Sequence, residues 1–267
     1  MKKVRISTLR KMKEDGTRFA MVTAHDALSA RLVEKAGIEI ILVGDSLGMT
    51  ALGFSTTLRV TLDMMLHHAA AVARCAELPL LVGDMPFMTY KISHEEALTN
   101  AGRLLSEGGM EAVKVEGGRE IAPVIERLVS AGIPVMGHVG LTPQSIHAQG
   151  GYRVQGRTEE AAERILVDAQ AVAEAGAFSI VLEAMPTSIG RKITKALDIP
   201  TIGIGAGPDC DAQVLVFYDL LGLTDRKLPK FVKKYADLFD PALEGLKTFA
   251  EEIRSGQFPG EEHTYGE

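Results

Sequence analysis

Short apolar runs that end in a polar residue recur along this chain, with amphipathic stretches between them. The run Ile40–Val43 ends at Gly44, Asp45 and Ser46, and a run rich in β-branched residues that stops at glycine predicts a buried strand. Residues 27–36 carry apolar side chains at helical spacing and are followed by Gly37, which predicts a helix and its end. Runs of the first kind predict eight strands, at residues 19–24, 40–43, 78–82, 112–115, 134–137, 178–182, 201–204 and 213–216.

Helices are predicted between most of these strands. Their ranges are residues 7–14, 27–36, 62–75, 94–107, 121–131, 159–175 and 189–197, with further helical segments after Pro229 and Pro241. Alternation of strands and helices implies parallel strands joined by right-handed crossovers. Eight such units favour a closed (β/α)8 TIM barrel, of the α/β class, over an open sheet, because no Gly-x-Gly-x-x-Gly follows the first strand. The long glycine-rich loop over residues 138–157 predicts a lid or binding loop.

Composition narrows the class of protein. The 267 residues, 46% hydrophobic and 24% charged, predict one barrel domain over residues 1–267 with a short N-terminal helix and a C-terminal helical extension. The net charge of −6 and the lack of a long basic run argue against a nucleic-acid partner. Cys75 and Cys210 have no metal-site spacing, and the sequence shows neither a signal peptide nor a membrane-length apolar run, so we expect a cytoplasmic protein.

Three carboxylates follow consecutive predicted strands. Asp45, Asp84 and Glu116 come after the second, third and fourth strands. Parallel strands about 4.8 Å apart bring such residues to one end of a barrel. Hard oxygen ligands suit Mg²⁺, and converging like charges need a cation between them. Each carboxylate taken alone is more consistent with a helix cap or a solvated loop residue, but three on consecutive strands make that interpretation less favourable.

Lys114 and Glu183 are the other two charged residues at predicted strand ends. Lys114 precedes Glu116 by two positions and therefore points to the same side of its strand. It is a candidate clamp for a substrate carboxylate or enolate oxygen, with a Schiff-base role or a salt bridge to a carboxylate as alternatives. Glu183 ends the sixth strand, opposite the second. It is a candidate general base or acid, with a capping role as the alternative. His138, after the fifth strand, is a further candidate to hydrogen-bond substrate.

With these residues in place, the chain resembles the ketopantoate hydroxymethyltransferase (3-methyl-2-oxobutanoate hydroxymethyltransferase) family. The matching stretches cover nearly the whole chain in order and together are highly specific. They are VGDSLGMT (43–50), DMPFM (84–88), VKVEGG (113–118), GHVGLTPQS (137–145), GGYRVQGR (150–157), VLEAMP (181–186), IGIGAG (202–207) and PGEEH (259–263).

The resemblance implies a (β/α)8 barrel of the phosphoenolpyruvate/pyruvate superfamily type and a specific reaction. The family transfers a hydroxymethyl group from 5,10-methylenetetrahydrofolate to 3-methyl-2-oxobutanoate, giving 2-dehydropantoate (ketopantoate) on the route to pantothenate and coenzyme A. Carried over to this sequence, Asp45, Asp84 and Glu116 are the expected Mg²⁺ ligands, and Glu183 is the expected proton acceptor. The expected keto-acid-binding residues are Asp45, Ser46, Asp84 and Lys114. The resemblance also implies a large homo-oligomer, with a decamer as the expected state.

Two alternatives stay open on sequence grounds. The chain could be another Mg²⁺-dependent member of the same superfamily, such as a lyase or mutase acting on an oxaloacetate-like or phosphonopyruvate-like acid. It could also be a barrel that binds a ligand without catalysis. Turnover with the folate donor would distinguish the hydroxymethyltransferase from the first alternative. Metal-dependent deuterium exchange at C3 of the keto acid would argue against the second.

Overall fold

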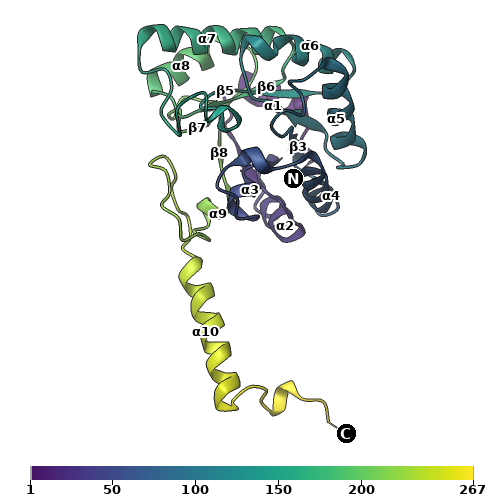
Figure 1. Cartoon of the computed structure of the whole chain (residues 1–267), viewed down its shortest axis with the longest axis vertical. Coiled ribbons are helices and arrows are strands. Elements are labelled where there is room, and N and C mark those ends of the chain that lie inside the picture. Colours follow the sequence, from purple (N-terminus) through teal and green to yellow (C-terminus); the bar gives the residue numbers. More distant parts are fainter. Residues whose placement is uncertain (1, 267) are drawn as a thin grey trace. The chain divides into compact units, whose positions relative to one another are not determined.

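The computed structural model describes residues 2–266 and shows a closed barrel of eight strands in the order β1 to β8. Every neighbouring pair of strands is parallel, including β1 with β8, which closes the ring (Figure 1). The predicted (β/α)8 fold is therefore confirmed. The strands are β1 (Phe19–Thr23), β2 (Ile40–Val43), β3 (Leu80–Asp84), β4 (Ala112–Lys114), β5 (Val135–Gly140), β6 (Ser179–Glu183), β7 (Thr201–Ile204) and β8 (Ala212–Leu215).

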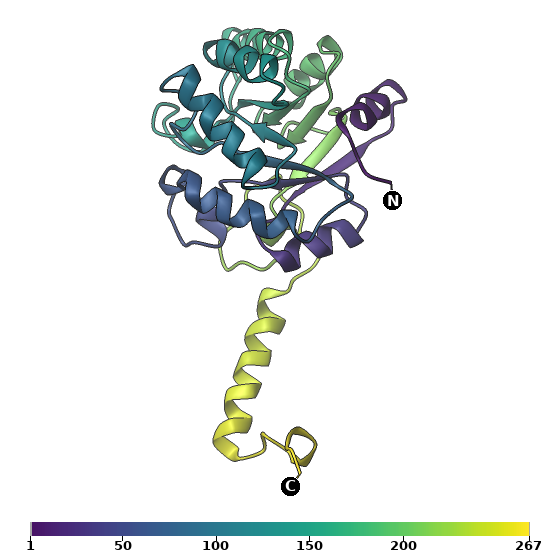
Figure 2. The ribbon, with the colours of Figure 1, turned by 90° about the vertical axis from the view of Figure 1, so that its right-hand side faces the viewer.

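Most helices of the barrel unit lie on the outer side of the strands, as two views at right angles show (Figures 1 and 2). Several begin at side-chain caps that the sequence supplies: Thr61, Ser93 and Thr158 each accept a hydrogen bond from a backbone N–H in the first turn. The helices are α1 (Ile6–Glu14), α2 (Ala27–Lys35), α3 (Leu47–Thr50), α4 (Leu62–Ala73), α5 (His94–Ser106), α6 (Ala122–Ser130), α7 (Glu159–Glu174), α8 (Thr187–Ala196), α9 (Phe217–Leu220) and α10 (Phe239–Ser255). Short 3₁₀ turns cover Thr57–Arg59 (η1), Arg119–Ile121 (η2), Pro143–Ser145 (η3) and Glu261–His263 (η4).

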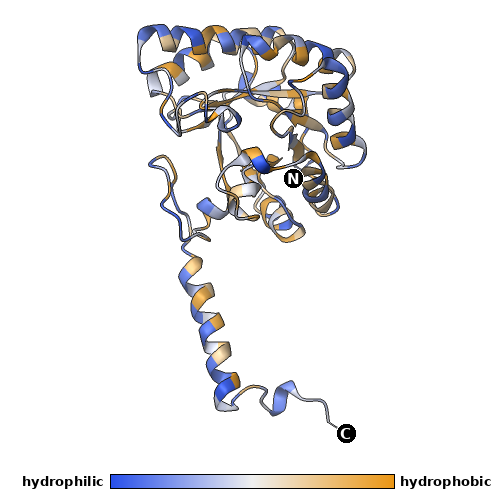
Figure 3. Ribbon diagram, viewed as in Figure 1, coloured by the Kyte–Doolittle hydropathy of each residue, from blue (hydrophilic) through white to orange (hydrophobic). Residues whose placement is uncertain are grey.

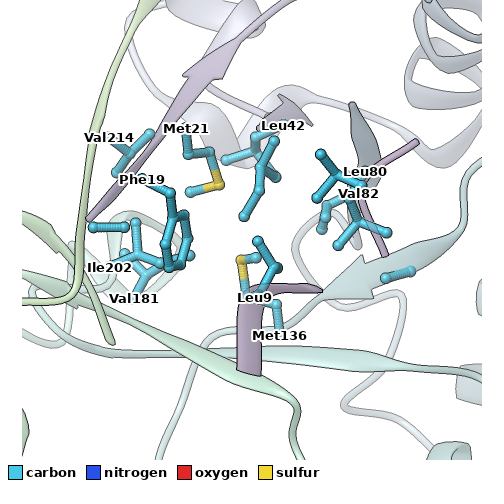
Figure 4. Packing of buried hydrophobic residues seen from close by; sticks show 14 residues of the cluster. Leu9, Phe19, Met21, Leu42, Leu80, Val82, Met136, Val181, Ile202 and Val214 are labelled. Carbon is cyan, nitrogen blue, oxygen red and sulfur yellow. The ribbon is translucent and has the colours of Figure 1, made fainter. Parts of the chain in front are cut away.

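The interior of the barrel is apolar at its N-terminal end. Helix α1 closes that end, since its Leu9 is fully buried among strand residues such as Phe19, Met21 and Met136, as Figure 4 shows. An ion pair between Lys13 and Asp211 at 2.8 Å joins the same helix to the chain just before β8. The N-terminal half of the barrel interior is therefore a packed apolar core. Polar residues of an active site would lie at the C-terminal end, as is usual in this fold.

Six strands differ from their predicted ranges, and for β3 and β5 the difference at an end exceeds one residue. The third strand begins at Leu80 instead of residue 78, because Pro79 has no N–H and the N–H of Leu78 donates to Glu34 at 2.7 Å. The fifth strand continues to Gly140, where it still pairs with Glu183 of β6. The predicted strand ended too early because Gly137 was taken as its end. Glycine is required there by close packing, since a Cβ would lie 2.3 Å from Val172 of α7. His138 is therefore a strand residue, and the long loop begins after Gly140.

The chain divides into two compact units, Met1–Phe217 and Tyr218–Glu267. In the second unit, residues 221–238 contain neither helix nor strand, so the helix predicted after Pro229 is wrong, whereas the one near Pro241 is α10. No residue of α10 is buried, and Leu243, Leu246, Phe249 and Ile253 are exposed at helical spacing. Figure 3 shows apolar and polar positions interspersed along this helix. That the chain is a single domain stays a prediction. None of the helices within residues 2–266 is both long and apolar enough to cross a bilayer.

Candidate active site

Toward the C-terminal ends of the strands, the side chains inside the barrel change from apolar to charged over two residues of each strand. Side chains two positions apart point to the same side of a strand. On each of β3 to β6, the last residue of the apolar core cluster is followed two positions later by a titratable one. Four such side chains therefore enter the C-terminal end of the barrel. The pairs are Val82 and Asp84, Ala112 and Lys114, Met136 and His138, and Val181 and Glu183.

Lys114 lies at the centre of the buried acidic residues. Its ammonium pairs with Asp84, its cross-strand neighbour, and lies 3.4 Å from Glu116 Oε1. The Lys114 residue is only 4% exposed. Asp45 joins the group through its backbone, whose N–H donates to Asp84 Oδ2 at 3.0 Å. The salt bridge that the sequence offered as an alternative role for Lys114 is therefore present.

Ser46 lies at the edge of this group. It is half-buried and begins the short helix α3. The preceding Gly44 provides room, since a Cβ there would lie 3.2 Å from Ser46 Oγ and 3.3 Å from Asp84 Oδ2. The structure thus brings Asp45, Ser46, Asp84, Lys114 and Glu116 to one place at the C-terminal end of the barrel.

Mutual burial shifts the pKa values of these groups in opposite directions. Burial and the nearby Asp84 and Glu116 raise the pKa of Asp45 well above its usual range. Burial alone would also raise the pKa of Glu116, but the charges of Lys114 and His138 outweigh it and hold that pKa at about 2. Burial disfavours the charged form of Lys114, yet the three carboxylates raise its pKa. The group therefore has more carboxylates than one ammonium can neutralise.

His138 connects this group to Glu183. Its Nδ1 lies 3.4 Å from Glu116 Oε1 and its Nε2 lies 3.2 Å from Glu183 Oε2. These are ion-pair contacts without the alignment of hydrogen bonds. Burial and Lys114 lower the pKa of His138, but the two glutamates outweigh them and raise it to about 9. Glu183, whose side chain is 14% exposed, is therefore linked to the Asp45–Asp84–Glu116 group through one imidazolium.

Two buried neutral residues also belong to the site, and the sequence interpretation missed both. Gln144 comes from η3, within the loop that follows β5, and Tyr90 comes from the loop that follows β3. Gln144 contacts Asp45 and Glu116, and the Tyr90 hydroxyl contacts Gln144 and the backbone of Glu116. Gln144 lies in the stretch GHVGLTPQS, but a single amide in a loop carries no charge or spacing signal.

The donor set suits a hard divalent cation in chemistry. Asp45, Asp84 and Glu116 present buried carboxylate oxygens, the ligands that Mg²⁺ prefers, and their excess negative charge favours a cation. Among residues 2–266, however, no three His, Cys, Asp or Glu side chains already converge on one metal position. In this form of the protein the carboxylates are organised around the Lys114 ammonium.

Comparisons of sequence agree on one family. A family model described as ketopantoate hydroxymethyltransferase matches residues 3–261. A 3-methyl-2-oxobutanoate hydroxymethyltransferase of Carboxydothermus hydrogenoformans is 54% identical over 265 residues, which are 99% of this chain and 96% of that protein. The protein of the same name from Pelobacter propionicus is 56% identical over 264 residues, with 99% and 98% covered.

Comparisons of structure extend the fold to a wider group. The crystal structure of a phosphonopyruvate hydrolase complex with oxalate and Mg²⁺ has a TM-score of 0.63 at 16% identity, covering 97% of this chain and 93% of that one. A 2,3-dimethylmalate lyase, described as a member of the PEP mutase/isocitrate lyase superfamily, has a TM-score of 0.59 at 17% identity, covering 96% and 89%. At these identities the likeness shows a shared barrel.

Proposed function

The chain belongs to the ketopantoate hydroxymethyltransferase family, and on this basis we propose that it transfers a hydroxymethyl group from 5,10-methylenetetrahydrofolate to 3-methyl-2-oxobutanoate. The product is 2-dehydropantoate, for the synthesis of pantothenate and coenzyme A. The observation that carries the proposal is the charged layer in the barrel. There, Asp45, Asp84, Lys114 and Glu116 lie together, and Glu183 enters from β6 beyond His138.

We assign Asp45, Asp84 and Glu116 as the residues that hold Mg²⁺. Their hard oxygens fit this ion, and the raised pKa of Asp45 reflects burial and the repulsion by Asp84 and Glu116 that a bound cation would relieve. When bound, the ion supplies Lewis-acid chemistry by stabilising negative charge that develops on the keto oxygen of the substrate. Lys114 pairs with both Asp84 and Glu116, so the ammonium and the ion would share these two carboxylates.

Lys114 remains able to bind the keto acid. An ammonium has three N–H donors, and Asp84 and Glu116 accept at most two of them here. The third donor is available for an anionic oxygen of the 2-oxo acid. Together with Asp45, Ser46 and Asp84, Lys114 would thus bind the acid at the C-terminal end of the barrel.

Glu183 is the proposed general base. It would accept the proton from C3 of 3-methyl-2-oxobutanoate, and C3 would then form a bond to the methylene carbon that the folate delivers. Water would supply the hydroxyl oxygen as the C–N bonds between that carbon and the carrier break and tetrahydrofolate leaves. His138 lies 3.2 Å from Glu183 Oε2 and holds the carboxylate at the inner face of β6.

The test is turnover of 3-methyl-2-oxobutanoate with and without Mg²⁺ and the folate donor. We expect 2-dehydropantoate only when both are present. C–C bond cleavage or mutase products from an oxaloacetate-like or phosphonopyruvate-like acid, with no folate-dependent product, would favour the alternative enzyme class. Absence of Mg²⁺-dependent deuterium exchange at C3 would favour a binding protein without catalysis.

Replacement of Asp84 is expected to weaken metal and substrate binding together. Asp84→Ala removes one proposed Mg²⁺ ligand and also the closest partner of Lys114. Calorimetric titration with Mg²⁺, and then with the keto acid in the presence of Mg²⁺, measures both affinities. An unchanged Mg²⁺ affinity in this variant would contradict the assignment of Asp84 as a ligand.

The loop after β5 is expected to behave as a lid. Glycines at positions 150, 151 and 156 have positive φ, and the loop bears the exposed Tyr152 and Val154. A loop that closes over the substrate excludes water from the reacting carbon. We expect amide hydrogen exchange over residues 141–157 to be faster in the free protein than in the keto-acid complex. Equal exchange in both states would argue against a lid.

We further propose that the protein is a cytoplasmic homo-oligomer, with a decamer as the expected state. The exposed apolar side chains Leu246, Phe249 and Ile253 on one face of α10 support self-association, because a contiguous apolar face is unfavourable in water. Sedimentation velocity measures the mass, and a monomer at micromolar concentration would contradict this proposal.

A further inference from the structure

Gln144 and Tyr90 are neutral side chains inside an otherwise charged site. Tyr90 is fully buried and Gln144 is 2% exposed. They come from different loops, which follow β3 and β5. Buried polar side chains at such a place are costly unless each of their hydrogen-bonding groups has a partner.

Every polar group of the Gln144 side chain has a partner. Its Nε2 donates to Asp45 Oδ2 at 2.9 Å and to the Met85 carbonyl at 3.0 Å. Its Oε1 accepts from the Tyr90 hydroxyl at 2.8 Å. The opposite amide orientation would set an oxygen against two acceptors and is excluded on chemical grounds. Among the described residues, Gln144 supplies the only hydrogen bond to the carboxylate of Asp45.

The backbone of Gln144 holds a second carboxylate. Its N–H donates to Glu116 Oε2 at 3.0 Å. The Tyr90 hydroxyl accepts from the N–H of Glu116 at 3.0 Å and lies 3.0 Å from the Glu116 carbonyl. One residue of the loop after β5 thus occupies one oxygen of each carboxylate, Oδ2 of Asp45 and Oε2 of Glu116.

We infer that Gln144, held by Tyr90, is a positioning residue that orients Asp45 and Glu116 for the cation and couples this orientation to the loop after β5. The inference rests on the proposed function. Because the same residue contacts both carboxylates and belongs to the loop, ordering of the loop and formation of the ligand set are one event. Cation binding must then stabilise the loop, and loosening of the loop must weaken cation binding by the same free energy.

Gln149 offers a matched control in the same loop. It donates to the carbonyl of Gly140 at 3.1 Å and to Thr142 Oγ1 at 3.0 Å, and it accepts from the N–H of Thr142 at 3.2 Å. Its hydrogen bonds thus connect one part of the loop with the end of β5 and the residues just after it, and none of them is to Asp45 or Glu116. Loss of Gln149 tests what loop structure alone contributes.

The experiment compares Gln144→Leu with Gln149→Leu, using Mn²⁺ as a paramagnetic substitute for Mg²⁺. Free Mn²⁺ measured by electron paramagnetic resonance gives the affinity without any turnover. We expect Gln144→Leu to bind Mn²⁺ roughly 10–100-fold more weakly, the usual effect of removing a residue that supports a metal ligand. Gln149→Leu should bind Mn²⁺ like the unmodified protein. In Gln144→Leu, KM for the keto acid should rise more than kcat falls.

Amide exchange provides the second readout. Mn²⁺ should slow exchange over residues 141–157 in the unmodified protein and in Gln149→Leu, but much less in Gln144→Leu. Tyr90→Phe removes a single oxygen and keeps the shape of the side chain. It should weaken Mn²⁺ binding in the same direction by a smaller factor, which keeps the inference testable if Gln144→Leu does not fold.

The outcomes separate this inference from the proposed function. Unchanged Mn²⁺ affinity in folded Gln144→Leu, or in Tyr90→Phe if the former does not fold, would overturn the inference alone. An equal loss in Gln149→Leu would also overturn it, because the effect would then be one of loop stability. Failure of the unmodified protein to bind Mn²⁺ or Mg²⁺ would overturn the metal assignment and this inference with it.

Discussion

Glu183→Gln is expected to slow removal of the C3 proton roughly 10²–10⁴-fold, the usual contribution of general acid–base catalysis. The substitution keeps the size of the side chain and removes its basicity. Binding of Mg²⁺ and keto acid should change little, because Glu183 lies on β6 and reaches the group of Asp45, Asp84 and Glu116 only through His138.

The measurement is deuterium exchange at C3 in the variant, together with calorimetric binding of the keto acid in the presence of Mg²⁺. Glu183→Asp is the matched control, since it keeps a base at a shorter reach and should retain part of the exchange. Near-normal exchange in Glu183→Gln would show that the base is another residue, with His138 as the next candidate. A collapse of Mg²⁺ affinity would place Glu183 among the metal ligands.

Lys114→Met is expected to lower the free energy of unfolding by about 3–5 kcal/mol at pH 7, the usual cost of leaving buried charges without their partner. The substitution removes the ammonium from between Asp84 and Glu116. Without it, burial and mutual repulsion raise the folded-state pKa of these carboxylates above their unfolded values. A raised folded-state pKa means that protonation stabilises the variant, so its deficit should shrink as the pH falls from 7 toward 4.5. Urea denaturation at several pH values measures this.

The double variant Lys114→Met, Asp84→Asn is the control for this prediction. It removes one carboxylate together with the ammonium and should recover part of the lost stability. In the unmodified protein the sign is reversed for Glu116. Its pKa is held at about 2, so its stabilising contribution is present above its unfolded value and is lost as the pH falls toward 2. A deficit in Lys114→Met that does not depend on pH would contradict the electrostatic account.

The fold followed from the sequence because each unit carried its own local signal. Strands β2 and β7 are apolar runs stopped by glycine or a loop, and both match their predicted ranges at each end. The positions of Asp84, Lys114, Glu116 and Glu183 followed as well, since a period of two places them on the inner side once the barrel is known.

Long-range contacts account for what the sequence did not indicate. Gly137 suggested a turn, but it is required by the close approach of Val172, which is distant in sequence. That error put His138 in a loop instead of between two glutamates. Gln144 and Tyr90 were missed because a neutral side chain gives no sign in the sequence that it belongs to a charged site. The structure shows that Gln144 contacts Asp45 and that Tyr90 contacts Gln144. The helix expected after Pro229 rested on local pattern alone, and residues 221–238 contain neither helix nor strand.

Closure of the ring between β1 and β8 has a consequence for how the polypeptide folds while the ribosome synthesises it. The register pairs Phe19 with Ala212. One edge of β1 therefore has no strand to hydrogen-bond with until β8 is in place. A ribosome releases the N-terminal strands first, and until β8 emerges the growing sheet exposes unpaired backbone at both margins, a hazard for aggregation. Contacts between such distant residues also slow folding. The completed barrel has no free margin, so the period of risk ends when β8 pairs with β1.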